Sequence, residues 1–165
     1  MDEWRRVERR RTREAEQELE KEILGRLQAM NAMTMRAKFG VIRKFGYAGI
    51  DGMDDVINML EEVLERRGYD LVPCVKGRYG PALHASVTLG EEERDLSFTA
   101  VQQLRKNRQK EANLTVTGVK VYRKGCRKFV VLTVKSEEIC NLRNEIGLPG
   151  TFAKFQPHVS VGVRG

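Results

Sequence analysis

Residues 83–87 read LHASV, and residues 157–161 read PHVSV. The chain has only two histidines, and each stands two positions before a serine in an apolar setting. In a β-strand, residues i and i+2 point to the same face, roughly 6.5 to 7 Å apart, so each stretch predicts a strand that projects an imidazole beside a hydroxyl. If the two strands are neighbours, four side chains form a near-symmetric polar cluster, namely His84, Ser86, His158 and Ser160.

This cluster suits acid–base chemistry at a phosphorus atom, because one imidazole can take a proton from the nucleophile while the other gives one to the leaving oxygen. A single histidine on an apolar strand is more often a hydrogen-bonded core residue, but two copies of one pattern favour the catalytic interpretation. No third His, Cys or carboxylate stands at ligand spacing, so we expect no metal and no cofactor. A Ser–His nucleophile is disfavoured because no elbow or acid partner is evident.

The motifs His84-Ala85-Ser86 and His158-Val159-Ser160 resemble those of the 2H phosphoesterase superfamily, which is named for two His-x-Ser/Thr motifs between apolar residues. The resemblance extends over residues 51–165. It implies an α+β class and a bilobal fold, with two antiparallel sheets around a central groove and flanking helices.

The same resemblance implies metal-independent cleavage or cyclisation of phosphodiesters, with nucleotides or RNA as substrates. His84 and His158 would be the acid and the base, in an order that the resemblance leaves open. Ser86 and Ser160 would hydrogen-bond the non-bridging phosphate oxygens.

Composition agrees with a phosphate-handling domain. The chain has 165 residues, is 41% hydrophobic and carries a net charge of +7, which suits one domain that binds anions. Residues 1–30 hold eight Lys/Arg and eight Asp/Glu, so the excess positive charge belongs to residues 31–165. Without an apolar run of roughly 20 residues, a secretory signal or closely spaced cysteines, we expect a cytoplasmic or nuclear protein that does not bind membranes.

The N-terminal part predicts a helical extension. Residues 3–30 are rich in strong helix formers, and their apolar residues recur at helical spacing only after Ala15. The interleaved charges favour a salt-bridged exposed helix over an RNA contact, and the helix is a candidate for recruiting a protein partner. Residues 32–50 are basic and contain glycines, which indicates a linking segment. We therefore divide the chain into an N-terminal extension and linker (1–50) and a catalytic domain (51–165).

Within the predicted catalytic domain, helical patterns cover residues 51–68, 96–112 and 136–145. Strand patterns cover residues 71–75, 82–89, 114–122, 129–134 and 158–163, and a turn at 123–127 joins two of them as a hairpin. Ser136 is the expected N-cap of the last helix.

The loops before the two motifs combine aromatic, basic and glycine residues. Aromatic rings stack on bases, and Lys or Arg neutralises phosphate, so these loops are candidates for substrate binding. The candidate residues are Lys76, Arg78 and Tyr79 in the first loop, with Lys154 and Phe155 in the second.

Three functions are compatible with these features. The first is a phosphodiesterase acting on RNA ends, 2′,3′-cyclic phosphates or short oligonucleotides. The second is a nuclease of cyclic or 2′-5′-linked signalling nucleotides that evades host defence. The third is a non-catalytic RNA-binding module, which would not need both histidines.

Overall fold

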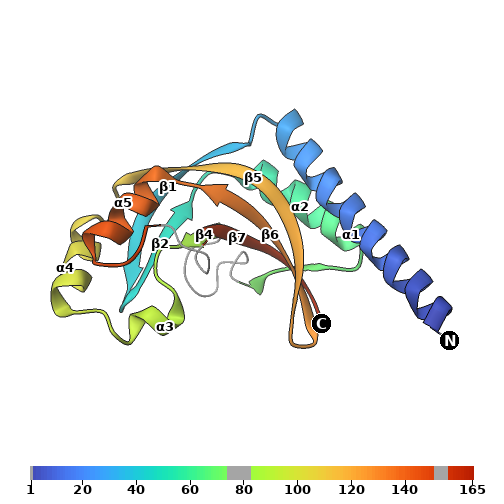
Figure 1. The fold of residues 1–165 in the computed structure, drawn as a ribbon. Coiled ribbons are helices and arrows are strands. Elements are labelled where there is room, and N and C mark those ends of the chain that lie inside the picture. The colour runs from blue at the N-terminus through green and yellow to red at the C-terminus, as the bar shows by residue number, and fades with distance from the viewer. Residues whose placement is uncertain (1, 74–82, 151–155) are drawn as a thin grey trace.

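A computed structural model describes residues 2–73, 83–150 and 156–165 of the chain. These segments contain helices and strands in alternating groups (Figure 1). None of the helices in the described segments has the length and apolarity needed to cross a bilayer. In chain order the elements are α1 (Asp2–Ala29), β1 (Thr34–Ile42), β2 (Phe45–Ile50), α2 (Asp54–Arg66), β3 (Asp70–Leu71), β4 (Leu83–Ser86), α3 (Gly90–Glu93), α4 (Phe98–Lys106), β5 (Glu111–Lys124), β6 (Arg127–Lys135), α5 (Glu137–Glu145) and β7 (His158–Arg164).

The strands form one antiparallel sheet in the order β3-β7-β4-β2-β1-β5-β6, and β6 also pairs with β7. Strand β7 is therefore hydrogen-bonded on both edges, to β6 on one side and to β4 and β3 on the other. The predicted α+β class is confirmed. The expected pair of sheets is replaced by one continuous sheet, because the β1–β5 and β4–β7 pairings join all the described strands.

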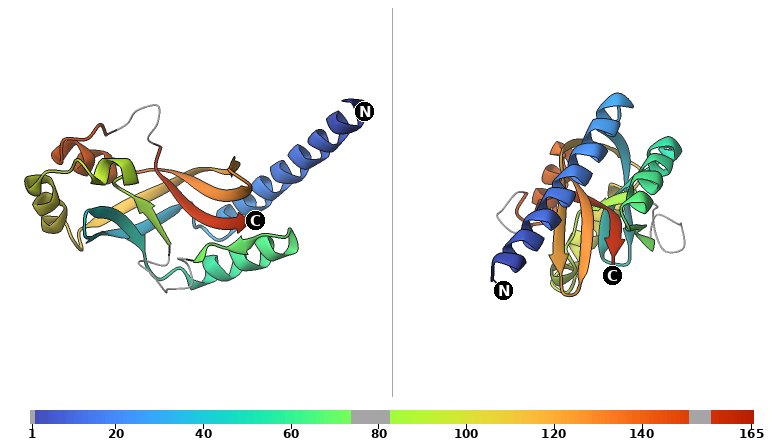
Figure 2. Two further views of the ribbon diagram at one scale, coloured as in Figure 1. Left: turned by 90° about the horizontal axis from the view of Figure 1, so that it is seen from below. Right: turned by 90° about the vertical axis from the view of Figure 1, so that its right-hand side faces the viewer.

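The helices lie in two groups at opposite ends of the sheet, with α1 and α2 at one end and α3, α4 and α5 at the other (Figures 1 and 2). Both groups bury apolar side chains against the sheet, and these side chains join one continuous hydrophobic core. The buried residues that the helices contribute include Leu19, Ile23, Leu27, Leu60, Val63, Leu64, Val101, Leu104, Ile139 and Leu142.

Helix α1 confirms the predicted long N-terminal helix and its division into two halves. Residues 2–15 are all exposed, whereas Leu19, Ile23 and Leu27 are buried. The apolar stripe that begins after Ala15 therefore marks where the helix joins the core. Only the first half of α1 extends beyond the body of the protein (Figure 2).

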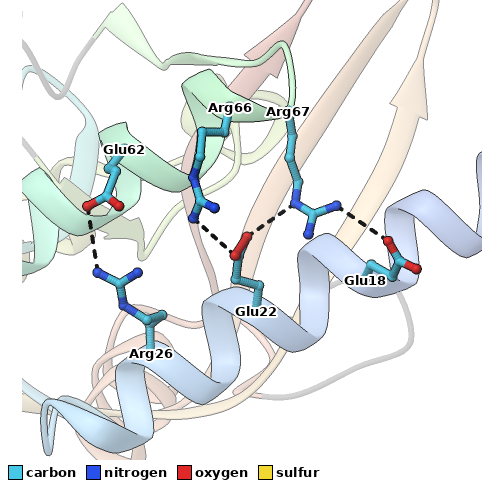
Figure 3. A network of polar contacts seen from close by, with 6 residues as sticks. All are labelled: Glu18, Glu22, Arg26, Glu62, Arg66 and Arg67. Carbon is cyan, nitrogen blue, oxygen red and sulfur yellow. Dashed lines mark hydrogen bonds and ion pairs between the residues drawn. The ribbon is translucent and has the colours of Figure 1, made fainter.

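Ion pairs join the second half of α1 to the end of α2 (Figure 3). The Glu22 carboxylate accepts hydrogen bonds from Arg66 at 3.1 Å and from Arg67 at 3.2 Å. Arg67 also lies 3.7 Å from Glu18, and Arg26 lies 3.7 Å from Glu62 on α2. Each partly exposed pair contributes at most about 1 kcal/mol, so the burial of Leu19, Ile23 and Leu27 is the main interaction that holds α1 in place.

Residues 34–50 form strands β1 and β2, so the prediction of a linking segment over residues 32–50 is wrong. Both strands are central, since they lie between β4 and β5 in the sheet. Buried Met35, Ala37 and Phe39 alternate with exposed residues in β1, which is the period of a strand with one buried face. The sheet thus continues across the predicted domain boundary at residue 50.

The remaining elements follow the predictions with several differences. The strand predicted over 71–75 is limited to β3, and the strand predicted over 82–89 ends at Ser86; residues 74, 75 and 82 of these predictions lie outside the described part of the chain. The β5–β6 hairpin forms, and the Ser136 hydroxyl caps α5 by accepting a hydrogen bond from the Ile139 N–H at 3.2 Å. The helix predicted over 96–112 ends at Lys106, because Gln109 adopts a left-handed φ of 68° and turns the chain into β5. The short helix α3 was not predicted.

A fully buried arginine joins α5 to the segment after β4. The Arg143 guanidinium donates two hydrogen bonds to the Glu92 carboxylate at 2.7 and 2.8 Å. It also donates to the backbone oxygens of Val87 and Pro149, both at 2.7 Å. The hydrogen bond from Arg143 holds the pKa of Glu92 below its usual value, against the desolvation that raises it. The pair therefore positions the chain immediately beyond β4.

We expect Glu92→Gln to lower the free energy of unfolding by about 3 kcal/mol at pH 7, because the buried Arg143 charge loses its counter-ion. The exposed neighbour supplies the control, Glu91→Gln, which should change stability by less than about 0.5 kcal/mol. Urea unfolding of each protein measures both values.

The difference in free energy of unfolding between the parent and Glu92→Gln should also depend on pH. The pKa of Glu92 is lower in the folded protein than in the unfolded chain, where it is about 4.5. The ionised carboxylate therefore contributes fully to the free energy of unfolding above pH 4.5, and this contribution is lost as the pH falls through the folded pKa. Unfolding curves from pH 7 to pH 3 should therefore converge for the two proteins. A difference that widened toward acid would contradict this assignment.

Candidate active site

The two motif strands are neighbours in the sheet, which the predicted cluster requires. β4 and β7 pair in antiparallel orientation with Ala85 opposite Val159. Both of these residues are fully buried on the face that packs against the core. Because side chains alternate along a strand, the residues on either side of them point to the opposite face. The four predicted residues His84, Ser86, His158 and Ser160 therefore share one face, where all are half-buried.

The register also decides which side chains face each other. In an antiparallel pair centred on Ala85 and Val159, His84 lies opposite Ser160, and Ser86 lies opposite His158. Directly opposed Cβ atoms are about 4.5 to 5.5 Å apart, and the diagonal between the two histidines is roughly 7 to 8 Å between Cα atoms. Each imidazole thus has one hydroxyl beside it along its strand and another across the pair.

A hydrogen bond decides the tautomer of His158 in its neutral form. The Nδ1 atom lies 3.1 Å from the backbone oxygen of Gln156. A carbonyl oxygen can only accept, so Nδ1 carries the proton and Nε2 is left with a lone pair. The neutral His158 ring is therefore arranged to accept a proton at Nε2.

Two aromatic residues of β2 that were not among the predicted site residues contact His84. The rings of Phe45 and Tyr47 lie 5.8 and 6.1 Å from the imidazole, both edge-to-face, and 5.7 Å from each other. The Tyr47 ring covers Gly40 of β1, where a Cβ atom would overlap it. The period-two pattern of residues 34–41 was the signal that could have found this part of the site.

A basic side chain lies on the same face beyond β2. Lys38 of β1 pairs with Gly49, and Gly49 pairs with His84, so the three residues form one row across three strands. Gly49 has no side chain between the other two. Lys38 and His84 lie two strands apart, which is roughly 10 Å. The long, exposed Lys38 side chain can therefore reach an anion that is bound beside His84.

The hydroxyl groups of two threonines lie next to His158, on the side of β7 that pairs with β6. Thr133 of β6 lies opposite His158 in the register, and its Oγ1 atom is 2.9 Å from that of Thr117 on β5. The face of the sheet around the histidines is thus lined by hydroxyl, imidazole and aromatic groups. Groups of this kind can transfer protons near neutral pH and donate hydrogen bonds to anionic oxygens.

The predicted substrate-binding residues lie outside the described part of the chain: Lys76, Arg78, Tyr79, Lys154 and Phe155. Within the described segments, no group of three or more His, Cys, Asp or Glu side chains is arranged to hold a metal ion. Cys126 is exposed and Cys140 is half-buried, and both are free thiols.

Comparison with known proteins found no matching family model, no matching curated protein and no matching solved structure.

We expect Gly40→Ala to change the surroundings of His84. The added methyl group would overlap the Tyr47 ring, so the ring must move away from Phe45 and the imidazole. The free energy of unfolding should fall by about 1 to 3 kcal/mol, as for other overpacked sites. The His84 Cε1–H resonance should shift in an NMR spectrum of the folded protein.

Gly118→Ala is the control for this substitution. Its Cβ atom would meet only the Thr133 hydroxyl, at 3.3 Å, which requires a small adjustment. The His84 resonance should stay in place in this variant. An unchanged His84 resonance in Gly40→Ala would show that Tyr47 does not hold the imidazole.

Proposed function

We propose that this protein is a metal-independent phosphodiesterase of the 2H type, acting on RNA ends, 2′,3′-cyclic phosphates or short oligonucleotides. One observation carries the proposal: the pairing of Ala85 with Val159 brings two distant His-x-Ser motifs onto one face, with each histidine opposite a serine. The net charge of +7 is favourable for a substrate that carries phosphate.

The tautomer of His158 supports a division of roles. When the ring is neutral its lone pair is at Nε2, so His158 can serve as the general base that takes the proton of the attacking hydroxyl or water. In this assignment His84 starts the step in its charged form and gives its proton to the leaving oxygen as the phosphorus–oxygen bond breaks. At the end of the step His158 is charged and His84 is neutral, so the proton count balances.

The serines stabilise the phosphate during this step. Ser86 and Ser160 each lie beside one histidine along the strand and opposite the other across the pair. Their hydroxyls donate to the non-bridging oxygens, where a hydrogen bond that strengthens in the transition state lowers the barrier.

The bilobal layout is part of the same proposal. The two groups of helices at opposite ends of the sheet are the outer layers of two lobes, and β4 and β7 meet between them (Figure 1). The substrate would then contact both lobes at the histidine pair.

A substrate panel tests the function. Linear RNA, RNA with a 2′,3′-cyclic phosphate, 2′-5′ oligoadenylate and cyclic dinucleotides are incubated with the protein in EDTA. We expect turnover of the first two to survive chelation, because the imidazoles and hydroxyls supply proton transfer and charge stabilisation. Turnover of the last two alone would indicate a nuclease of signalling nucleotides. Loss of all turnover in EDTA with rescue by a divalent ion would exclude the proposed mechanism.

Substitutions at the cluster should separate proton transfer from phosphate binding. His84→Ala and His158→Ala should each lower kcat by about 10²- to 10⁴-fold. The double variant should be scarcely slower than either single variant, because the two groups act in one step. Ser86→Ala and Ser160→Ala should also lower kcat, whereas the threonine variants should keep activity because threonine retains the hydroxyl.

Thermal unfolding has to accompany these measurements. If the histidines are structural, the loss of activity in each alanine variant should follow the loss of stability. A His84→Ala protein that unfolds like the parent and still turns over at the parental rate would refute the two-histidine mechanism.

A further inference from the structure

A cavity of about 380 Å³ lies between the β1–β2 turn and α4, on the part of the molecule away from α1. Its lining contains three cations and no acidic residue, together with an apolar floor. The lining residues are Arg43, Lys44, Leu96, Phe98, Val101 and Arg105. Charge complementarity therefore favours an anionic occupant that also has an apolar surface.

Phe98 is the most exposed large hydrophobic residue in the described part of the chain, with 78% of its surface accessible. It is the first residue of α4, directly after the N-cap Ser97. At this exposure the ring adds little to the hydrophobic core. An exposed ring beside cations is the arrangement on which proteins stack the bases of single-stranded nucleic acids.

Arg43 adopts an unfavourable backbone conformation at the turn. Its φ of 58° lies in the left-handed region, which glycine and asparagine adopt more easily than arginine. A glycine would relieve the strain there but would remove a cation from the cavity. The two-residue turn between β1 and β2 requires this conformation, and it leaves the Arg43 side chain in the lining of the cavity.

The cavity is connected to the candidate active site through β2. Lys44 immediately precedes Phe45, whose ring contacts the His84 imidazole. Gly49, five residues after Lys44 on β2, lies opposite His84. At about 3.3 Å per residue, the distance along the strand from Lys44 to Gly49 is roughly 17 Å. At about 3.4 Å for each stacked nucleotide, five nucleotides cover this distance.

We propose that this cavity is a subsite for single-stranded RNA, about five nucleotides from the bond that is cleaved. Phe98 stacks on one base, and Arg43, Lys44 and Arg105 neutralise the adjacent phosphates. Duplex RNA does not fit this role, because its bases are already stacked on one another. The link to cleavage rests on the proposed function, whereas RNA binding at the cavity does not.

Binding is tested with a fluorescein-labelled ten-nucleotide single-stranded RNA that carries 2′-O-methyl groups. Phe98→Ala should weaken binding by about fivefold or more, and Phe98→Trp should preserve it because the indole also stacks. Arg105→Gln should lower the slope of log Kd against log salt by about 0.7, as expected for one lost phosphate contact.

Lys106→Gln is the control for Arg105→Gln, because Lys106 is the next residue on α4, is exposed and does not line the cavity. It should leave the affinity and the salt slope nearly unchanged. Equal effects of the two substitutions, or unchanged affinity in Phe98→Ala, would show only diffuse attraction and overturn the subsite.

Turnover on substrates of two lengths connects the subsite to catalysis. Phe98→Ala should lower kcat/KM on a ten-nucleotide RNA by about fivefold and leave a three-nucleotide RNA unaffected. Phe98-dependent binding without cleavage of either RNA would reject the proposed function and keep the subsite. Cleavage of both lengths with Phe98-independent affinity would reject the subsite and keep the function.

Discussion

The pairing of β4 with β7 at Ala85 and Val159 is the contact on which the rest of the structure depends. It closes the series of strand pairings that runs through β2, β1, β5 and β6 and returns to β7. It also decides which side chains enter the core. A slip of one residue in either strand would exchange the faces, burying a histidine and a serine and exposing their apolar neighbours. The fold and the candidate site are therefore specified by the same register.

The Arg143–Glu92 pair secures this register from outside the sheet. Arg143 has no exposed surface, so its charge is stable only because carboxylate and carbonyl oxygens surround it. One of those oxygens belongs to Val87, which directly follows the motif strand β4. Apolar residues in place of the pair could give equal stability, but they would not impose the same geometry on this backbone. The pair thus contributes more to position than to stability.

The features that could be predicted from the sequence were those that local patterns encode. The histidine strands, the β5–β6 hairpin and the Ser136 cap all follow from alternation, turn residues or capping within a few positions. The β1–β2 strands were missed because Gly40, Gly46 and basic residues resembled a linker, although Met35, Ala37 and Phe39 alternate. Pairings between distant segments, such as β6 with β7, have no local signature. Lys38 and Tyr47 lie beside His84 through pairings of the same kind, so finding them required both the alternation in β1 and the register of β2 with β4.

The position of β7 in the chain has a consequence for how the protein folds. This strand contacts β3, β4 and β6, yet it follows all the other described strands in chain order. Its partner Ala85 lies 74 residues before Val159, so this contact closes a long loop and forms slowly compared with the local hairpins. Until β7 arrives, a nascent chain exposes the unpaired edges of β4 and β6, which can pair with other chains and aggregate. The histidines therefore come together only in the last stage of folding, when β7 covers both of these edges.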